Sequence, residues 1–185
     1  EAGVRILRDY AHDQTRRMLF DTFRYMPMFD WERHFAKEEG IATVARSVLA
    51  TLGKAESPAL VAKFTKLEGC PEGSLGRRFW EMYDTNGWPF PGQKGGVPEG
   101  TTVHDWVHIL AGYDPTPIGE IQVTAFITAS SPNPRLFGAM VLALGLYEAG
   151  AIKLPQFQAP PHGGVMETPN AGPALADALR RGMAV

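Results

Sequence analysis

The spacing of apolar residues constrains the fold of this chain more than any other feature. Apolar side chains recur every three or four positions through most of the sequence, for example at Ile41, Val44, Val48 and Leu52. This period is that of an amphipathic α-helix, and no convincing run alternates apolar and polar residues as a half-buried strand does. We therefore predict an all-α fold, with helices over residues 4–26, 41–52, 58–69, 75–86, 104–111, 134–149 and 174–185 and one more that begins at Pro115 or Pro117.

Capping residues and glycines mark where several of these helices begin and end. Ser57 and Ser74 are typical of residues that precede a helix, and Gly53 and Gly112 are typical of helix ends in the left-handed conformation. Residues 88–100 and 151–173 contain too many prolines and glycines for regular structure. We interpret the second stretch as a lid or a wrapping arm, because loops of about twenty residues are unusual without a functional reason. The expected architecture is a single-domain helical bundle over residues 1–185, with long Pro/Gly-rich loops.

Length and composition restrict the class of protein. A chain of 185 residues, 44% hydrophobic and 21% charged, suffices for one globular domain with its own core. The formal net charge of -2 gives no electrostatic basis for binding nucleic acid. The most apolar run, residues 136–147, is well short of the roughly 20 residues that cross a bilayer. The single cysteine, Cys70, fits a reducing compartment, so we expect a cytoplasmic protein, although a chain that begins with Glu1 leaves any targeting segment open.

The segment VHDWVHILAGYDPTPIGEI, residues 103–121, holds the side chains with the clearest chemistry. On a helix that turns about 100° per residue, His104, Asp105 and His108 lie within one arc of about 100° and share a face. Histidines four residues apart can direct one ring nitrogen each at the same metal ion. Three apolar residues of this helix point elsewhere and are expected to anchor it in the core: Trp106, Val107 and Leu110.

A carboxylate follows this helix at a spacing that can complete a metal site. Gly112 is expected to end the helix, and a second helix that begins at Pro115 or Pro117 can return and bring Glu120 towards the histidines. Two imidazoles with one or two carboxylates suit Zn²⁺, Fe²⁺ or Mn²⁺ and leave a position open for water or substrate. The alternative is that the histidines are partly exposed helix residues and that Asp105 and Glu120 are solvated.

The same residues carry a resemblance to a known family. His104-Asp105-Trp106-Val107-His108, followed after eleven residues by Glu120, resembles the HDxxH-and-glutamate signature of the Coq-four family of coenzyme Q biosynthesis proteins. The segment GSLGRRFWEMYDTNGWPFPG, residues 73–92, is similar to the part of that family just upstream of the signature. The specific resemblance covers residues 73–127, and the remainder is compatible with the all-helical fold of the family.

The resemblance implies a metal-dependent enzyme of ubiquinone assembly. It implies that His104, Asp105, His108 and Glu120 form the catalytic site and bind a divalent metal, usually taken as zinc, with iron or manganese as the alternatives that the donor set allows. The implied reaction is oxidative decarboxylation with hydroxylation of a prenylated ring derived from 4-hydroxybenzoate. The implied partners are a hydrophobic phenolic or prenylated substrate, the surface of the inner membrane, other biosynthetic enzymes and further copies of the chain.

Two other functions are open at this point. The first is a metalloenzyme of bacterial specialised metabolism that uses the same site on another small aromatic molecule. The second is a non-catalytic scaffold that binds lipid or quinone precursors and uses the metal structurally. No glycine-rich GxGxxG turn follows a strand, so no flavin or nicotinamide site is expected, and either oxygen or a partner supplies the redox step.

A few further residues allow a functional role beside a structural one. His162 could add a metal ligand or a proton relay, but an ordinary loop histidine is expected. Tyr113 could hydrogen-bond a metal ligand, and its alternative is a capping aromatic ring in the turn. An apolar stripe that is usually core could instead line a channel for a prenyl tail. Its members are Phe137, Met140, Val141 and Leu144, together with Met26, Met28 and Phe29.

Overall fold

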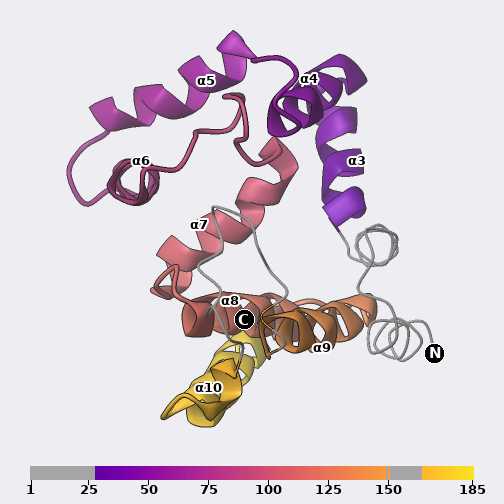
Figure 1. Ribbon diagram of the computed structural model, residues 1–185, viewed down its shortest axis with the longest axis vertical. Coiled ribbons are helices and arrows are strands. Elements are labelled where there is room, and N and C mark those ends of the chain that lie inside the picture. The colour runs from indigo at the N-terminus through magenta and orange to yellow at the C-terminus, as the bar shows by residue number, and fades with distance from the viewer. Residues whose placement is uncertain (1–27, 149, 151–163) are drawn as a thin grey trace. The chain divides into compact units, whose positions relative to one another are not determined.

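All regular structure in the described part of the chain is helical. A computed structural model describes residues 28–148, 150 and 164–185, and within them it contains eight α-helices, three short 3-10 helices and no strand (Figure 1). The all-α prediction is thereby confirmed for these residues. The helices expected within residues 4–26, the loop residue His162 and most of the expected lid lie outside the described residues.

The chain forms two compact units. Among the described residues, one unit comprises residues 30–112, and the other comprises residues 28–29, 113–148, 150 and 164–185. The first unit contains the predicted histidine motif, and the second contains the predicted glutamate. The expectation of a single domain over residues 1–185 stays a prediction.

The unit of residues 30–112 ends in the helix that carries the histidine motif. Its helix α6 packs against both η1 and α7. In order along the chain, its elements are α3 (Met28–Glu39), α4 (Ile41–Thr51), α5 (Pro58–Thr65), η1 (Lys66–Gly69), α6 (Leu75–Asn86), η2 (Glu99–Thr101) and α7 (Thr102–Ala111). The first two residues of α3 lie outside this unit.

Most of the predicted helix ends of this unit are confirmed. The Ser74 hydroxyl accepts a hydrogen bond from the backbone N–H of Arg77 at 3.3 Å and so caps α6. Gly87 and Gly112 end α6 and α7 in the left-handed conformation, with φ of 63° and 73°, which glycine adopts without the strain of a Cβ atom. Ser57 precedes α5 as predicted, but its side chain makes no capping hydrogen bond. Its backbone N–H instead donates to a carbonyl of the 88–100 loop at 2.8 Å.

Stacked aromatic rings form the core of this unit. Phe79 of α6 stacks on Tyr83, with ring centroids 4.8 Å apart, and on Trp106 of α7, with centroids 4.1 Å apart. Trp106 therefore anchors α7 as predicted, and Ile109 packs against the same cluster. The prediction that Leu110 is an anchor is wrong, because this side chain is 69% exposed. The face of α7 that packs against this cluster carries the partly buried Trp106 and Ile109, and Leu110 lies to one side of it.

Helix α4 buries small residues rather than its large apolar ones. Ile41 is 78% exposed and Leu52 is 62% exposed, although the apolar periodicity of this segment predicts a buried stripe. The buried residues of the helix are Ser47 and Ala50. The Ser47 hydroxyl accepts a hydrogen bond from the backbone N–H of Glu99 at 2.8 Å, so this face of α4 approaches the start of the motif helix closely.

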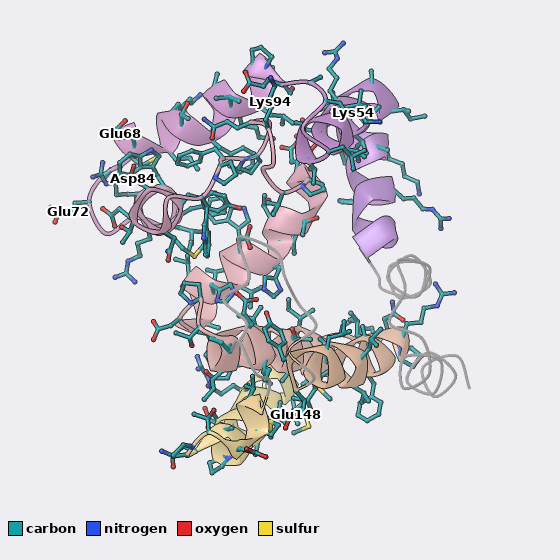
Figure 2. All side chains as sticks on the ribbon, in the orientation of Figure 1. Lys54, Glu68, Glu72, Asp84, Lys94 and Glu148 are labelled. Carbon is teal, nitrogen blue, oxygen red and sulfur yellow. The ribbon has the colours of Figure 1, made fainter. Side chains whose placement is uncertain are left out.

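The unit of residues 113–185 is built around α8. This helix packs against α9 and α10, and η3 lies against both of those helices. Glu148, labelled in Figure 2, accepts a hydrogen bond from the backbone N–H of Met166 at 3.0 Å and thereby ties η3 to the end of α9. The elements are α8 (Pro117–Ser130), α9 (Arg135–Glu148), η3 (Val165–Glu167) and α10 (Ala171–Met183) (Figure 1).

Two glycines of this unit allow backbone segments to approach closely. A Cβ atom on Gly119 would overlap the backbone carbonyl of Asp114, and one on Gly182 would overlap that of Phe126. Gly182 thus lets α10 pack directly on α8, and Gly119 lets the turn before α8 fold onto the first turn of that helix. None of the helices within the described ranges is both long enough and apolar enough to cross a membrane.

Candidate metal centre

The start of α7 is fixed by hydrogen bonds to a buried glutamate. Glu99 of η2 is 4% exposed. Its backbone N–H donates to the Ser47 hydroxyl, its carbonyl accepts from the Thr102 hydroxyl at 2.7 Å, and its carboxylate accepts from Lys63 Nζ at 2.5 Å. Lys63 also donates to Glu39 at 2.8 Å. The helix that carries the histidines therefore begins at a point tied to α4 and α5.

His104 and His108 project from this helix with their ring nitrogens facing each other. The two Nε2 atoms are 3.2 Å apart, and the rings meet edge to face with centroids 4.9 Å apart. Two nitrogens that each lie about 2.05 Å from one tetrahedral zinc ion are separated by about 3.3 Å. His108 is 3% exposed and His104 is half-buried. The two nitrogens thus lie at hydrogen-bond distance from each other, and this separation is also close to that of two ligands of a single ion.

Asp105 is engaged by a tyrosine of the neighbouring helix. The Tyr83 hydroxyl donates to Asp105 Oδ2 at 2.5 Å. Burial first, and then the charge of Asp105, raise the pKa of Tyr83 well above its usual value of 10.0, so the phenol stays protonated and remains a donor. Tyr83 is a residue of the site that the sequence analysis did not identify, because the pattern of α6 indicates only that its ring is buried.

Glu120, the predicted carboxylate ligand, lies in the first turn of α8. The Thr116 hydroxyl caps this helix by accepting from the backbone N–H of Gly119 at 3.2 Å. Glu120 is 4% exposed, and a buried carboxylate is unfavourable unless hydrogen bonds, an opposite charge or a metal ion compensate it. Burial first, and then the charge of Glu120, raise the pKa of Tyr147 on α9. Glu120 is therefore a buried carboxylate rather than a solvated one.

The three predicted ligands offer a donor set that suits a divalent metal. His104, His108 and Glu120 provide two imidazole nitrogens and a carboxylate oxygen, and as a group they could hold a metal ion. Two histidines and one glutamate, with a fourth position for water or substrate, are the ligands of one class of catalytic zinc site. The identity of the metal and a direct bond from Asp105 stay predictions.

The other residues with a predicted functional role are Tyr113 and the apolar residues of α9. The ring of Tyr113 lies 4.8 Å from the guanidinium carbon of Arg181, which stacks over it. Phe137 is 62% exposed and Val141 is 36% exposed, whereas Met140 is buried. The core alternative for this stripe therefore holds for Met140 but not for Phe137 and Val141, and the channel for a prenyl tail stays a prediction.

Comparisons with known proteins identify no relative of this chain. No protein-family model matches it, and no match was found among curated proteins or among solved structures. The resemblance of residues 73–127 to the Coq-four family therefore stays a prediction.

Proposed function

We propose that this chain binds one divalent metal ion, zinc in the first place, through His104, His108 and Glu120, and that it acts on a phenolic ring in ubiquinone biosynthesis. The observation that carries the metal proposal is the 3.2 Å separation of the histidine Nε2 atoms. The burial of Glu120 supports it, because a compensated carboxylate is expected there. The substrate class comes from the sequence resemblance.

The residues of the chain have distinct tasks in this proposal. His104 and His108 would hold the ion through ring nitrogens and Glu120 through a carboxylate oxygen, and the fourth position would be left for an oxygen atom of the substrate. The bound ion would supply Lewis acidity that polarises this phenolate or carboxylate oxygen. Asp105, held by the Tyr83 hydroxyl, fixes the rotation of α7 so that both imidazoles stay directed at the same point.

The proposed reaction replaces the carboxyl group of a prenylated, 4-hydroxybenzoate-derived ring by a hydroxyl group. The bond between the ring and the carboxyl carbon breaks with release of CO₂, and a carbon–oxygen bond forms at the same ring carbon. This is a two-electron oxidation of the ring, for which molecular oxygen is the oxidant. One oxygen atom enters the product, and a partner protein supplies the two electrons and two protons that reduce the other to water. We place the reaction at the inner-membrane surface, where a prenylated substrate resides.

Elemental analysis tests the metal proposal. The full chain, without a tag and purified without added metal or chelator, is compared with Glu120→Ala, His108→Ala and the control His34→Ala, which removes an exposed histidine of α3. We expect about one zinc, iron or manganese per chain in the unaltered protein and in the control, and loss of the metal in the other two variants. Helical circular dichroism should remain in all four proteins, so that loss of metal is not loss of fold.

The outcomes separate the candidate functions. Full metal content in His108→Ala would contradict the proposed ligands. Metal-loaded protein that releases CO₂ from a prenylated 4-hydroxybenzoate, in the presence of oxygen and a reductant, would support the proposed reaction. Tightly bound metal without any CO₂ release would favour the non-catalytic scaffold, and turnover of a small aromatic acid without a prenyl chain would favour the enzyme of specialised metabolism.

A further inference from the structure

Tyr147 has a buried hydroxyl group with no hydrogen-bond partner among the residues that the structure describes. The residue is 2% exposed, and its ring belongs to the apolar cluster of Ile121 and Val165 in the unit of residues 113–185. Nearly all buried polar groups in native proteins are hydrogen-bonded, so an exception calls for an explanation. The ring alone would satisfy the packing of this cluster, and phenylalanine would do so without an unpaired group.

The unpaired hydroxyl lies in the electrostatic field of Glu120. Tyr147 is carried by α9 and Glu120 by α8, and these two helices pack against each other. Ile121, the residue after Glu120, is in the same cluster as the Tyr147 ring. The charge of Glu120 is felt at the phenol, where it adds to burial in raising the pKa, yet the phenol makes no hydrogen bond to that carboxylate. The Tyr147 hydroxyl is thus a protonated donor in the same unit as the proposed metal ligand Glu120, and it donates no hydrogen bond to that carboxylate.

Active sites keep such donors for their ligands. A preorganised donor that is unpaired in the free protein becomes paired when a ligand oxygen arrives, and a water-excluded site strengthens the bond that forms. A neutral O–H that donates to an anionic oxygen forms a charge-assisted hydrogen bond, which is about twice as strong as a neutral one. An unpaired buried group lowers the stability of the free protein, and such losses of stability are common at functional sites.

We propose that the Tyr147 hydroxyl donates a hydrogen bond to an anionic oxygen atom, phenolate or carboxylate, of the substrate bound at Glu120. This inference rests on the proposed function, because it takes Glu120 to be a ligand of the metal to which that oxygen binds. Tyr147 is then a residue that determines specificity: it favours substrates with an anionic oxygen over amines and over neutral apolar molecules.

The test uses the full chain loaded with Co²⁺ and 4-hydroxybenzoate as the probe, which carries both kinds of oxygen. The visible absorption of bound cobalt reports the probe without any turnover. Tyr147→Phe removes the hydroxyl and keeps the ring, and Tyr113→Phe is the matched control, since it removes the hydroxyl of another buried tyrosine of the same unit. A second measurement is the melting temperature of each protein without metal or probe.

We expect Tyr147→Phe to bind cobalt as the unaltered protein does, to bind the probe at least tenfold more weakly, and to melt no lower in the free state, because the lost hydroxyl had no partner to lose. Tyr113→Phe should bind the probe normally. A Kd within twofold of the unaltered protein, a clear drop in free-state melting temperature, or failure of the unaltered, cobalt-loaded protein to bind the probe would each overturn the inference alone. Absence of cobalt binding by the unaltered protein would overturn the proposed metal site and the inference together.

Discussion

Replacing Tyr83 by phenylalanine isolates one hydrogen bond of the site. The change removes the hydroxyl that donates to Asp105 at 2.5 Å and keeps the ring that stacks on Phe79 and Phe90. A hydrogen bond to a charged group contributes about 1.5–3 kcal/mol. Because packing is conserved, we expect the free energy of unfolding to fall by about 2 kcal/mol, and the melting temperature to fall by about 4–8 °C for a chain of this size.

A double-mutant cycle with Asp105→Ala, which removes the acceptor, assigns this loss to the pair. Urea unfolding at pH 7, followed by circular dichroism, would be measured for each single variant, the double variant and the control Tyr113→Phe. We expect the double variant to lose clearly less than the sum of the two single losses, because the second change removes a bond that is already absent. Additive losses would refute the argument that Tyr83 and Asp105 stabilise the fold through each other.

The pH dependence of the same variant follows from the pKa of Tyr83. Burial, and then Asp105, raise this pKa well above 10.0 in the folded protein, whereas the unfolded chain loses the proton near pH 10. Between these two values the unfolded state binds fewer protons, so folding stability declines as pH rises. The advantage of the unaltered protein over Tyr83→Phe should therefore be constant from about pH 6 to about pH 9 and shrink above pH 10. A constant difference up to pH 11 would contradict the reasoning.

Two more substitutions probe how the site is held in place. Lys63→Met leaves the carboxylate of Glu99 buried without its cation. Because Lys63 is itself half-exposed, we expect the free energy of unfolding to fall by only about 1–2 kcal/mol. Urea titration measures this loss beside the control Lys66→Met, which changes an exposed lysine, and equal losses in the two variants would show that the pair of Lys63 and Glu99 does not stabilise the fold. Gly119→Ala places a Cβ atom against the Asp114 carbonyl and should cost about 3 kcal/mol, whereas Gly138→Ala, where space is open, should be neutral or stabilising in the same thermal melts.

Features that depend on neighbouring residues were predictable from the sequence. The caps of α6 and α7 follow from Ser74, Gly87 and Gly112, each of which acts on backbone groups only a few residues away. The converging histidines follow in the same way from the geometry of a single helix turn. The sequence therefore predicted the all-α character of the described residues, the end of the motif helix at Gly112 and the shared face of His104 and His108, although the helix begins two residues earlier than expected.

Features that depend on tertiary packing were not predictable in this way. Periodicity identifies an apolar face but not the element that covers it, which explains why Ile41 and Leu110 are exposed while small residues of α4 are buried. The hydrogen bond between Tyr83 and Asp105 joins residues 22 positions apart, so no local sequence pattern predicts it. The sequence does single out Tyr147, because it is the one residue with a hydroxyl group in the apolar run of residues 136–147.

The spacing of His104 and His108 would let α7 act as a bidentate chelator of the proposed metal ion. Its nitrogens are already 3.2 Å apart, on a helix held by Glu99 at one end and by the stacking of Trp106 further along. Ordering of the two rings therefore accompanies folding rather than metal capture, and little conformational entropy remains to be lost when an ion arrives. A zinc finger needs its ion to fold, whereas this unit has an aromatic core of its own. If the proposed metal site is correct, this unit should therefore stay folded after a chelator removes the ion.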